Sequence, residues 1–142
     1  MFTIAVCDDD MQERMQEVQI VKNIFSQKEL EAGIEEFQTG QHFLDVLHRV
    51  PYDIVLLDIQ MGEVSGFTLA EELYKITGGE NIIFVSSMEN LVFESIHFRP
   101  FRFVRKSHLE EELTEAVESW IQQNTKTECL EFDETGGVTT IL

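Results

Sequence analysis

The sequence contains little of several residue types, and each shortage excludes a class of protein. Only two of its 142 residues are cysteine, Cys7 and Cys129, and neither lies in a C-x-x-C or cysteine–histidine spacing. We therefore predict no disulfide framework and no zinc site, which suits a protein of the reducing cytoplasm. No apolar run approaches the roughly 20 residues that span a bilayer, so we expect no membrane segment.

Positive charge is also scarce. Lysine and arginine together number 10 against 27 aspartates and glutamates, and the formal net charge is −17. A surface this acidic repels phosphate backbones, so we expect this part of the chain not to bind DNA by itself. The simplest interpretation of the charge is a well-solvated surface.

Apolar residues instead alternate between two kinds of segment. Short β-branched runs predict buried strands at residues 3–7, 54–57 and 82–85, with weaker strands at 33–39 and 102–106. Spacings of three and four predict helices over 11–25, 43–50, 67–76, 91–98 and 107–121. The first helical stripe includes Met11 and Met15, and the last helix opens on a capping box, Ser107 with Glu110. The order predicts an α/β domain, a doubly wound five-stranded parallel sheet with helices on both faces.

The character of the sequence changes after about Gln123. Residues 124–128 (NTKTE) resemble a linker, and residues 129–142 predict a β-hairpin around the Gly136-Gly137 turn. We therefore divide the chain into a domain at 1–123 and a hairpin extension at 124–142. A lone hairpin is marginal in water, so it packs on the domain, pairs with another chain or begins a second domain.

Polar side chains gather where the predicted strands end. The carboxyl ends of parallel strands form the ligand-binding edge of an open sheet. Asp8 and Asp9 follow the first strand, Asp58 ends the third, and Ser86 and Lys106 end the fourth and fifth. Three close carboxylates repel one another unless a cation intervenes, and oxygen ligands favour Mg²⁺. With the ion bound, a carboxylate can attack an electrophilic phosphorus, and the central Asp58 is the best candidate nucleophile.

Each of these residues also has an ordinary interpretation. Asp8 and Asp9 precede a predicted helix and would serve as capping residues, and Asp58 would serve in a strand-ending turn. Ser86 would cap a helix, and Lys106 would be a surface lysine. Only their joint position at one edge of the sheet favours a phosphoryl site, with Lys106 and Ser86 binding phosphoryl oxygens.

Four segments together resemble the receiver domain of bacterial two-component response regulators over residues 2–122. They are VCDDD (6–10), LLDIQMGEVSG (56–66), IIFVSS (82–87) and FRFVRKS (101–107). The resemblance implies a flavodoxin- or CheY-like fold with strand order 2-1-3-4-5 and a Mg²⁺ cofactor. It also implies a role for each matching residue. Asp58 would be the phosphoacceptor, and Asp8, Asp9, Asp58 and the Gln60 carbonyl would be the metal ligands. Lys106 and Ser86 would stabilise the phosphoryl group, and Ser86 and Phe103 would be the switch residues.

Within that superfamily, residues 81–96 and 99–113 most resemble regulators with a LytTR-type DNA-binding output, and 127–142 resemble the first two strands of that output domain. The resemblance implies a cytoplasmic transcriptional regulator that a sensor histidine kinase phosphorylates and that forms a homodimer on activation. DNA would be bound only through an output domain mostly outside this chain. We expect a signalling switch and not a turnover enzyme.

Three positions depart from the family pattern. Gly62 replaces a proline after the metal-loop methionine, which predicts a more mobile loop. Ser107 replaces a proline whose peptide bond is commonly cis, which favours a trans bond here because a cis bond before serine costs about 2.5–4 kcal/mol. Phe103 replaces the more usual tyrosine and lacks its hydroxyl. These changes affect the switching geometry more than the chemistry.

Two other functions remain open at this point. A Mg²⁺-dependent aspartyl-phosphate phosphatase like the haloacid dehalogenases needs a second acid two residues after the nucleophile, where this chain has Gln60. A pseudo-receiver used only for protein contacts has usually lost an acid or the lysine, and this chain keeps both.

Overall fold

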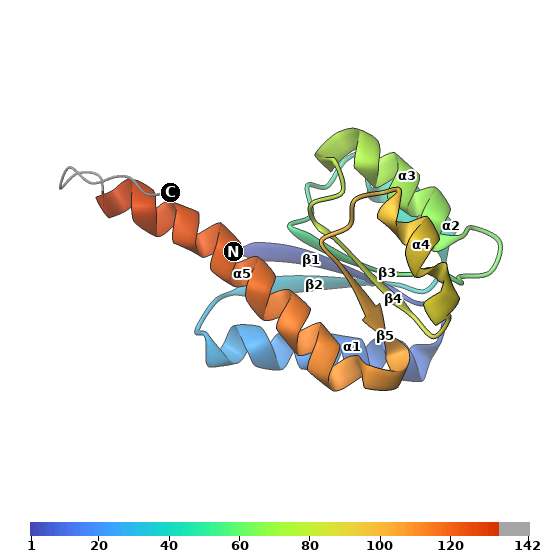
Figure 1. Cartoon of the computed structure of the whole chain (residues 1–142), viewed down its shortest axis with the longest axis horizontal. Coiled ribbons are helices and arrows are strands. Elements are labelled where there is room, and N and C mark those ends of the chain that lie inside the picture. The colour runs from blue at the N-terminus through green and yellow to red at the C-terminus, as the bar shows by residue number, and fades with distance from the viewer. Residues whose placement is uncertain (134–142) are drawn as a thin grey trace.

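The computed structural model describes the backbone of residues 1–133 and the side chains of residues 1–125. Figure 1 shows a parallel sheet between two layers of helices. The strands are β1 (Phe2–Cys7), β2 (Ala32–Phe37), β3 (Ile54–Asp58), β4 (Ile82–Ser86) and β5 (Arg102–Arg105). The α-helices are α1 (Met11–Gln27), α2 (Gly40–Val46), α3 (Gly66–Thr77), α4 (Val92–Ile96) and α5 (Leu109–Asp133). Two 3₁₀ turns, η1 (Glu89–Leu91) and η2 (Lys106–His108), precede α4 and α5.

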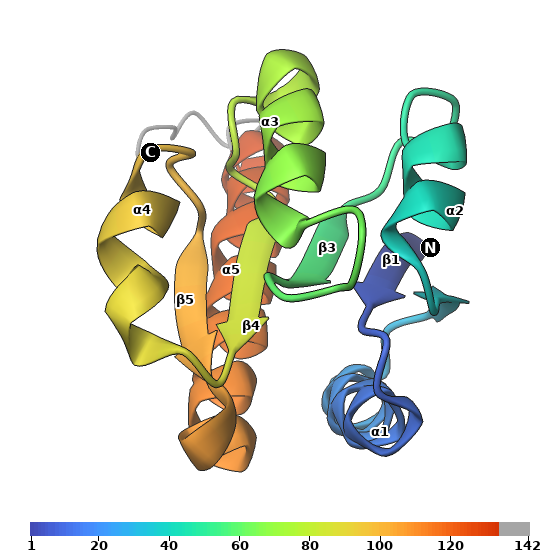
Figure 2. The ribbon, with the colours of Figure 1, turned by 90° about the vertical axis from the view of Figure 1, so that its right-hand side faces the viewer.

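The strand order is β2-β1-β3-β4-β5, and all four pairings are parallel. Figure 2 shows β5, β4, β3 and β1 side by side in this order. The register aligns Cys7 with Leu57 and Asp58 with Val85, so the strands end at a common edge. The predicted fold is therefore confirmed, with all five strands within two residues of their expected positions.

Two apolar cores cover the two faces of the sheet. On one face, α1 and α5 pack against β-strand residues such as Val6, Leu56 and Val85. On the other face, α2 and α3 pack against Ala5, Leu57 and their neighbours. Residues of β3 and β4 are buried throughout, because helices cover both sides of these central strands. Among the described residues, no helix combines the length and apolar character needed to cross a bilayer.

The apolar stripe predicted for α1 is wrong at its beginning. Met11 and Met15 are 62% and 59% exposed, whereas Arg14 and Glu17 lie on the buried side of the helix. The stripe from Val18 to Phe25 does face the core. The first two turns thus direct polar side chains toward the sheet edge, where partners for them exist.

The predicted linker and the first hairpin strand are also wrong. Helix α5 continues through Asp133 and covers residues 124–133. No glycine or proline interrupts the sequence between Pro100 and Gly136, so nothing in this stretch ends a helix. The Asn124 side chain donates a hydrogen bond to the Trp120 carbonyl, and the Thr125 hydroxyl donates one to the Ile121 carbonyl. Helices accommodate such bonds to the carbonyl four residues earlier. The remainder of the predicted hairpin, residues 134–142, lies outside the described residues.

The capping box at the start of α5 is not formed as predicted. Ser107 lies within η2, and its hydroxyl contacts Glu89 and His108 instead of capping the helix. Within the described part of the chain all peptide bonds are trans, including the bond between Lys106 and Ser107, as expected from the serine.

Candidate functional site

The carboxyl edge of the sheet brings the predicted acidic residues together. One carboxylate oxygen from each of Asp8, Asp9 and Asp58 lies within 4.8 Å of the other two. Asp8 and Asp58 are 0% and 5% exposed, whereas Asp9 reaches solvent. Two buried carboxyl groups and an accessible one, all with oxygen donors, match the ligands that Mg²⁺ prefers. These residues therefore fit a hard divalent cation.

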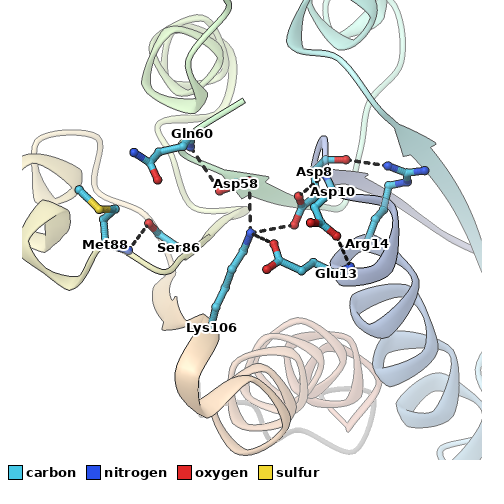
Figure 3. Close-up of polar contacts among 9 residues, drawn as sticks. All are labelled: Asp8, Asp10, Glu13, Arg14, Asp58, Gln60, Ser86, Met88 and Lys106. Carbon is cyan, nitrogen blue, oxygen red and sulfur yellow. Dashed lines mark hydrogen bonds and ion pairs between the residues drawn. The ribbon is translucent and has the colours of Figure 1, made fainter. Parts of the chain in front are cut away.

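Lys106 lies across this cluster from the end of β5. Figure 3 shows its ammonium directed at Asp8 and Asp58. The ammonium is 3.1 Å from Asp8 Oδ2 and 3.3 Å from Asp58 Oδ2. Only 12% of the Lys106 side chain is exposed. Burial alone would lower the pKa of Lys106, but its contacts with Glu13, Asp58 and Asp8 raise that pKa above its usual value. The ammonium is therefore charged and compensates part of the buried negative charge.

The same surroundings set the ionisation of Asp58. Burial raises the pKa of this carboxyl, Lys106 opposes the rise and Asp8 adds to it, and the result is about 7. The Gln60 amide donates a hydrogen bond to Asp58 Oδ1 over 3.2 Å and also favours the ionised form. The Asp58 carboxyl therefore holds its proton more strongly than an ordinary aspartate does.

The three consecutive aspartates, Asp8 to Asp10, have two roles that the sequence analysis treated as alternatives, helix capping and membership of the acidic cluster. Asp10 caps α1, because its Oδ1 accepts a hydrogen bond from the Glu13 amide over 2.9 Å. Asp8 and Asp9 face the cluster instead. Asp8 Oδ1 also accepts the Asp10 amide over 2.9 Å, which fixes the turn between β1 and α1. Capping and clustering are therefore both present, on different residues.

Ser86 and Phe103 lie on the neighbouring strands. The buried Ser86 hydroxyl accepts a hydrogen bond from the Met88 amide over 3.0 Å and retains its own hydrogen as a donor. Phe103 is half-buried on β5 and packs against the core on the α2–α3 face. Ser86 thus ends β4, the strand next to the one that Asp58 ends, and Phe103 lies one strand further out on β5.

Glycines shape the loop that follows Asp58. Gly62 has φ +75°, a left-handed conformation that a proline cannot adopt, and this explains the departure from the family pattern there. A Cβ on Gly66 would lie 2.3 Å from the Asp58 carbonyl oxygen, so the start of α3 approaches the end of β3 too closely for a side chain.

Sequence reasoning missed three residues of this site, all on α1. Glu13 pairs with Lys106, and the buried Arg14 donates from Nη1 to the Asp8 carbonyl over 2.8 Å. Glu17 is 1% exposed, and its Oε2 has no hydrogen-bond partner among the described residues. Burial, and then the adjacent Asp8 carboxylate, raise the pKa of Glu17 to about 10. One signal was available, because Glu17 places an acid on the apolar stripe, four residues before Val21.

A parallel sheet in the order 2-1-3-4-5 with helices on both faces is a CheY-like fold. The sequence matches the family described as "Response regulator receiver domain" over residues 4–118, and the chain belongs to that family.

Solved structures agree on the fold. The REC domain of AraT, a response regulator from Geobacillus stearothermophilus, superposes with a TM-score of 0.74 at 18% identity, covering 89% of this chain and 98% of that one. A CheY-like receiver domain protein from Methanospirillum hungatei gives 0.73 at 20% identity, covering 89% and 98%. The response regulator TrrA from Thermotoga maritima, solved in complex with Mg²⁺-BeF, gives 0.69 at 24% identity, covering 84% and 99%.

A curated relative is similar over part of the chain. The sensory transduction protein LytR of Staphylococcus epidermidis is 24% identical over 91 residues, which are 62% of this chain and 36% of LytR. The match thus spans about a third of the length of this relative.

Proposed function

We propose that this receiver domain accepts a phosphoryl group on Asp58 from the phosphohistidine of a sensor histidine kinase, in a Mg²⁺-dependent reaction. The observation that carries the proposal is the position of the Lys106 ammonium, 3.3 Å from Asp58 and 3.1 Å from Asp8, at the end of the central strands. A buried lysine held there is placed to bind an oxygen of a phosphoryl group on Asp58.

The chain's own residues suit this transfer. An oxygen of ionised Asp58 attacks phosphorus, the phosphorus–nitrogen bond breaks, and the imidazole leaves with the bonding electron pair. Asp8, Asp9, Asp58 and the Gln60 carbonyl would hold Mg²⁺, which when bound neutralises charge on the phosphoryl oxygens. Lys106 holds a second phosphoryl oxygen, and the free hydrogen of Ser86 is available for a third.

The acyl phosphate would then act as a switch. Ser86 moves toward the phosphoryl group, Phe103 turns into the space that this movement opens, and the β4–α4–β5 surface changes shape. The two conformations pre-exist, and phosphorylation changes their populations. The altered surface supports homodimer formation. The domain is thus a signalling switch that modifies itself once per signal, not a turnover enzyme.

The output we propose is transcriptional and of the LytTR type, in a cytoplasmic regulator. The support is the similarity to LytR, together with the resemblance of residues 81–96 and 99–113 to receivers that have a LytTR-type output. DNA would be contacted by that output domain, since the receiver itself is strongly acidic.

The experiment is phosphorylation by acetyl phosphate and Mg²⁺, read by intact mass. We expect the wild-type chain to gain one phosphoryl group and Asp58→Asn to gain none. Asp45→Asn, which changes an exposed aspartate on α2, is the matched control and should be labelled like the wild type. Equal labelling of Asp58→Asn and the wild type would refute the assignment.

A further inference from the structure

Lys106 has one partner that the proposed phosphoryl site does not require. Its ammonium contacts three carboxylates, those of Asp8, Asp58 and Glu13. Asp8 and Asp58 belong to the cluster that fits a cation, and Glu13 does not. Of these three contacts the one with Glu13 is also a hydrogen bond, so Glu13 takes up one of the three N–H donors of the ammonium.

Glu13 is held in this position by its surroundings. It lies in the first turn of α1, and its amide is capped by Asp10. The Asp10 amide in turn donates to Asp8, and Asp8 contacts Lys106. Figure 3 shows the resulting ring, in which Glu13 reaches Lys106 from α1 while Asp8 and Asp58 reach it from the sheet. The Glu13 side chain is 42% exposed, so it can move away without opening the core.

A phosphoryl group on Asp58 changes which negatively charged group binds the Lys106 ammonium most strongly. Modification converts the Asp58 carboxylate into a neutral acyl group that carries a phosphoryl dianion. This dianion binds the Lys106 ammonium more strongly than a carboxylate does. Glu13 would then still accept a hydrogen bond from the Lys106 ammonium, which leaves fewer N–H donors for the phosphoryl group. It would also place a second negative charge beside the phosphoryl oxygens.

We infer that Glu13 is an internal competitor for Lys106, which weakens the binding of a phosphoryl group at Asp58 and lowers the population of the activated conformation. This inference rests on the proposed function of Asp58 and concerns a residue outside the phosphoryl chemistry itself. Glu13 is a positioning residue in this scheme, since it acts only through the lysine.

The test is the affinity for beryllofluoride, a phosphoryl mimic, measured by amide NMR titration of the whole chain in saturating Mg²⁺. Glu13→Gln keeps the length of the side chain and removes its charge, so we expect beryllofluoride to bind about threefold to tenfold more tightly. Glu13→Asp keeps the charge and shortens the reach, so we expect an intermediate gain of about twofold to threefold.

Glu63→Gln is the matched control, because Glu63 is an exposed acid of the β3–α3 loop near Asp9. It should bind beryllofluoride like the wild type. Unchanged affinity in Glu13→Gln would overturn the inference. A gain in Glu13→Gln with none in Glu13→Asp would also overturn it, because the effect would then come from charge at a distance and not from competition for Lys106.

The same titration separates this inference from the proposed function. If the wild type binds beryllofluoride and the Glu13 variants bind it equally well, only the competition is wrong. If neither the wild type nor any variant binds it in Mg²⁺, the phosphoryl site and the competition are both wrong.

Discussion

The buried Arg14 guanidinium holds the Asp8 backbone, with 2.8 Å between Arg14 Nη1 and the Asp8 carbonyl oxygen. Its Nε also pairs with Glu36 on β2 at 3.0 Å. Arg14 thus ties the end of β1 to the neighbouring strand and fixes the direction in which the Asp8 carboxylate leaves the chain. Substituting a group that orients a metal ligand in this way typically weakens metal binding by about 10-fold to 100-fold.

We therefore expect Arg14→Met to bind Mg²⁺ about tenfold more weakly than the wild type, as measured by calorimetric titration. Methionine retains much of the apolar contact of the arginine side chain and loses both hydrogen bonds. Arg49→Met removes an exposed arginine and should leave the affinity unchanged. Equal Mg²⁺ affinity in Arg14→Met and Arg49→Met would show that Arg14 does not position Asp8.

Glu17 makes the stability of the domain depend on pH. Its pKa is about 10 in the folded chain against an ordinary value of 4.5, so the folded state keeps a proton that the unfolded state releases. The contribution of the neutral carboxyl is fully present below about pH 4.5, and the free energy of unfolding falls as the pH rises from there toward 10.

Glu17→Gln should remove this dependence. Relative to the wild type, the variant should gain on the order of 4 kcal/mol in the free energy of unfolding between about pH 5 and about pH 8. Urea denaturation in EDTA at both pH values measures the change. Comparing the two pH values cancels the pH-independent cost of burying an amide. A constant difference between variant and wild type across this range would contradict the prediction.

Substituting Gly66 tests the close contact between the start of α3 and the end of β3 at Asp58. Its substitution by alanine would place a Cβ 2.3 Å from the Asp58 carbonyl oxygen and 2.7 Å from Ile59 Cα. We expect Gly66→Ala to destabilise the fold by about 3 kcal/mol and to weaken Mg²⁺ binding, because β3 must move. Thermal unfolding and the same calorimetric titration measure both effects.

The control for Gly66 is Gly78, at the end of α3. Gly78 has φ +77°, and no heavy atom lies within 4 Å of the position that a Cβ would take, so alanine there strains only the backbone. Gly78→Ala should cost about 1 kcal/mol and leave Mg²⁺ binding unchanged. If both variants bind Mg²⁺ like the wild type, the contact between Gly66 and the end of β3 does not support the site.

The sequence was sufficient to predict the sheet and its acidic edge. Strands such as Ile54–Asp58 are buried on both faces and therefore form continuous apolar runs that need no tertiary information to recognise. Parallel strands end at one edge, so Asp8, Asp58 and Lys106 could be placed together from the chain order alone.

The contributions of α1 could not be predicted in the same way. Met11 and Met15 fit the apolar spacing but are exposed to solvent. The helix takes this orientation because its polar residues form ion pairs across the fold, Arg14 with Glu36 and Glu13 with Lys106. Such pairs join residues far apart in the sequence, and periodicity carries no information about them. The prediction for residues 124–133 failed for a local reason, since a polar, threonine-containing stretch resembles a linker although nothing in it ends a helix.

Borohydride trapping tests the central claim most directly, because an acyl phosphate on aspartate is reduced to homoserine and the modified peptide can be sequenced by mass spectrometry. After treatment with acetyl phosphate in Mg²⁺, we predict homoserine at position 58 and unmodified Asp8 and Asp9, and with EDTA in place of Mg²⁺ we predict no homoserine. Homoserine at another aspartate, or equal labelling of Asp58 in EDTA, would contradict the account.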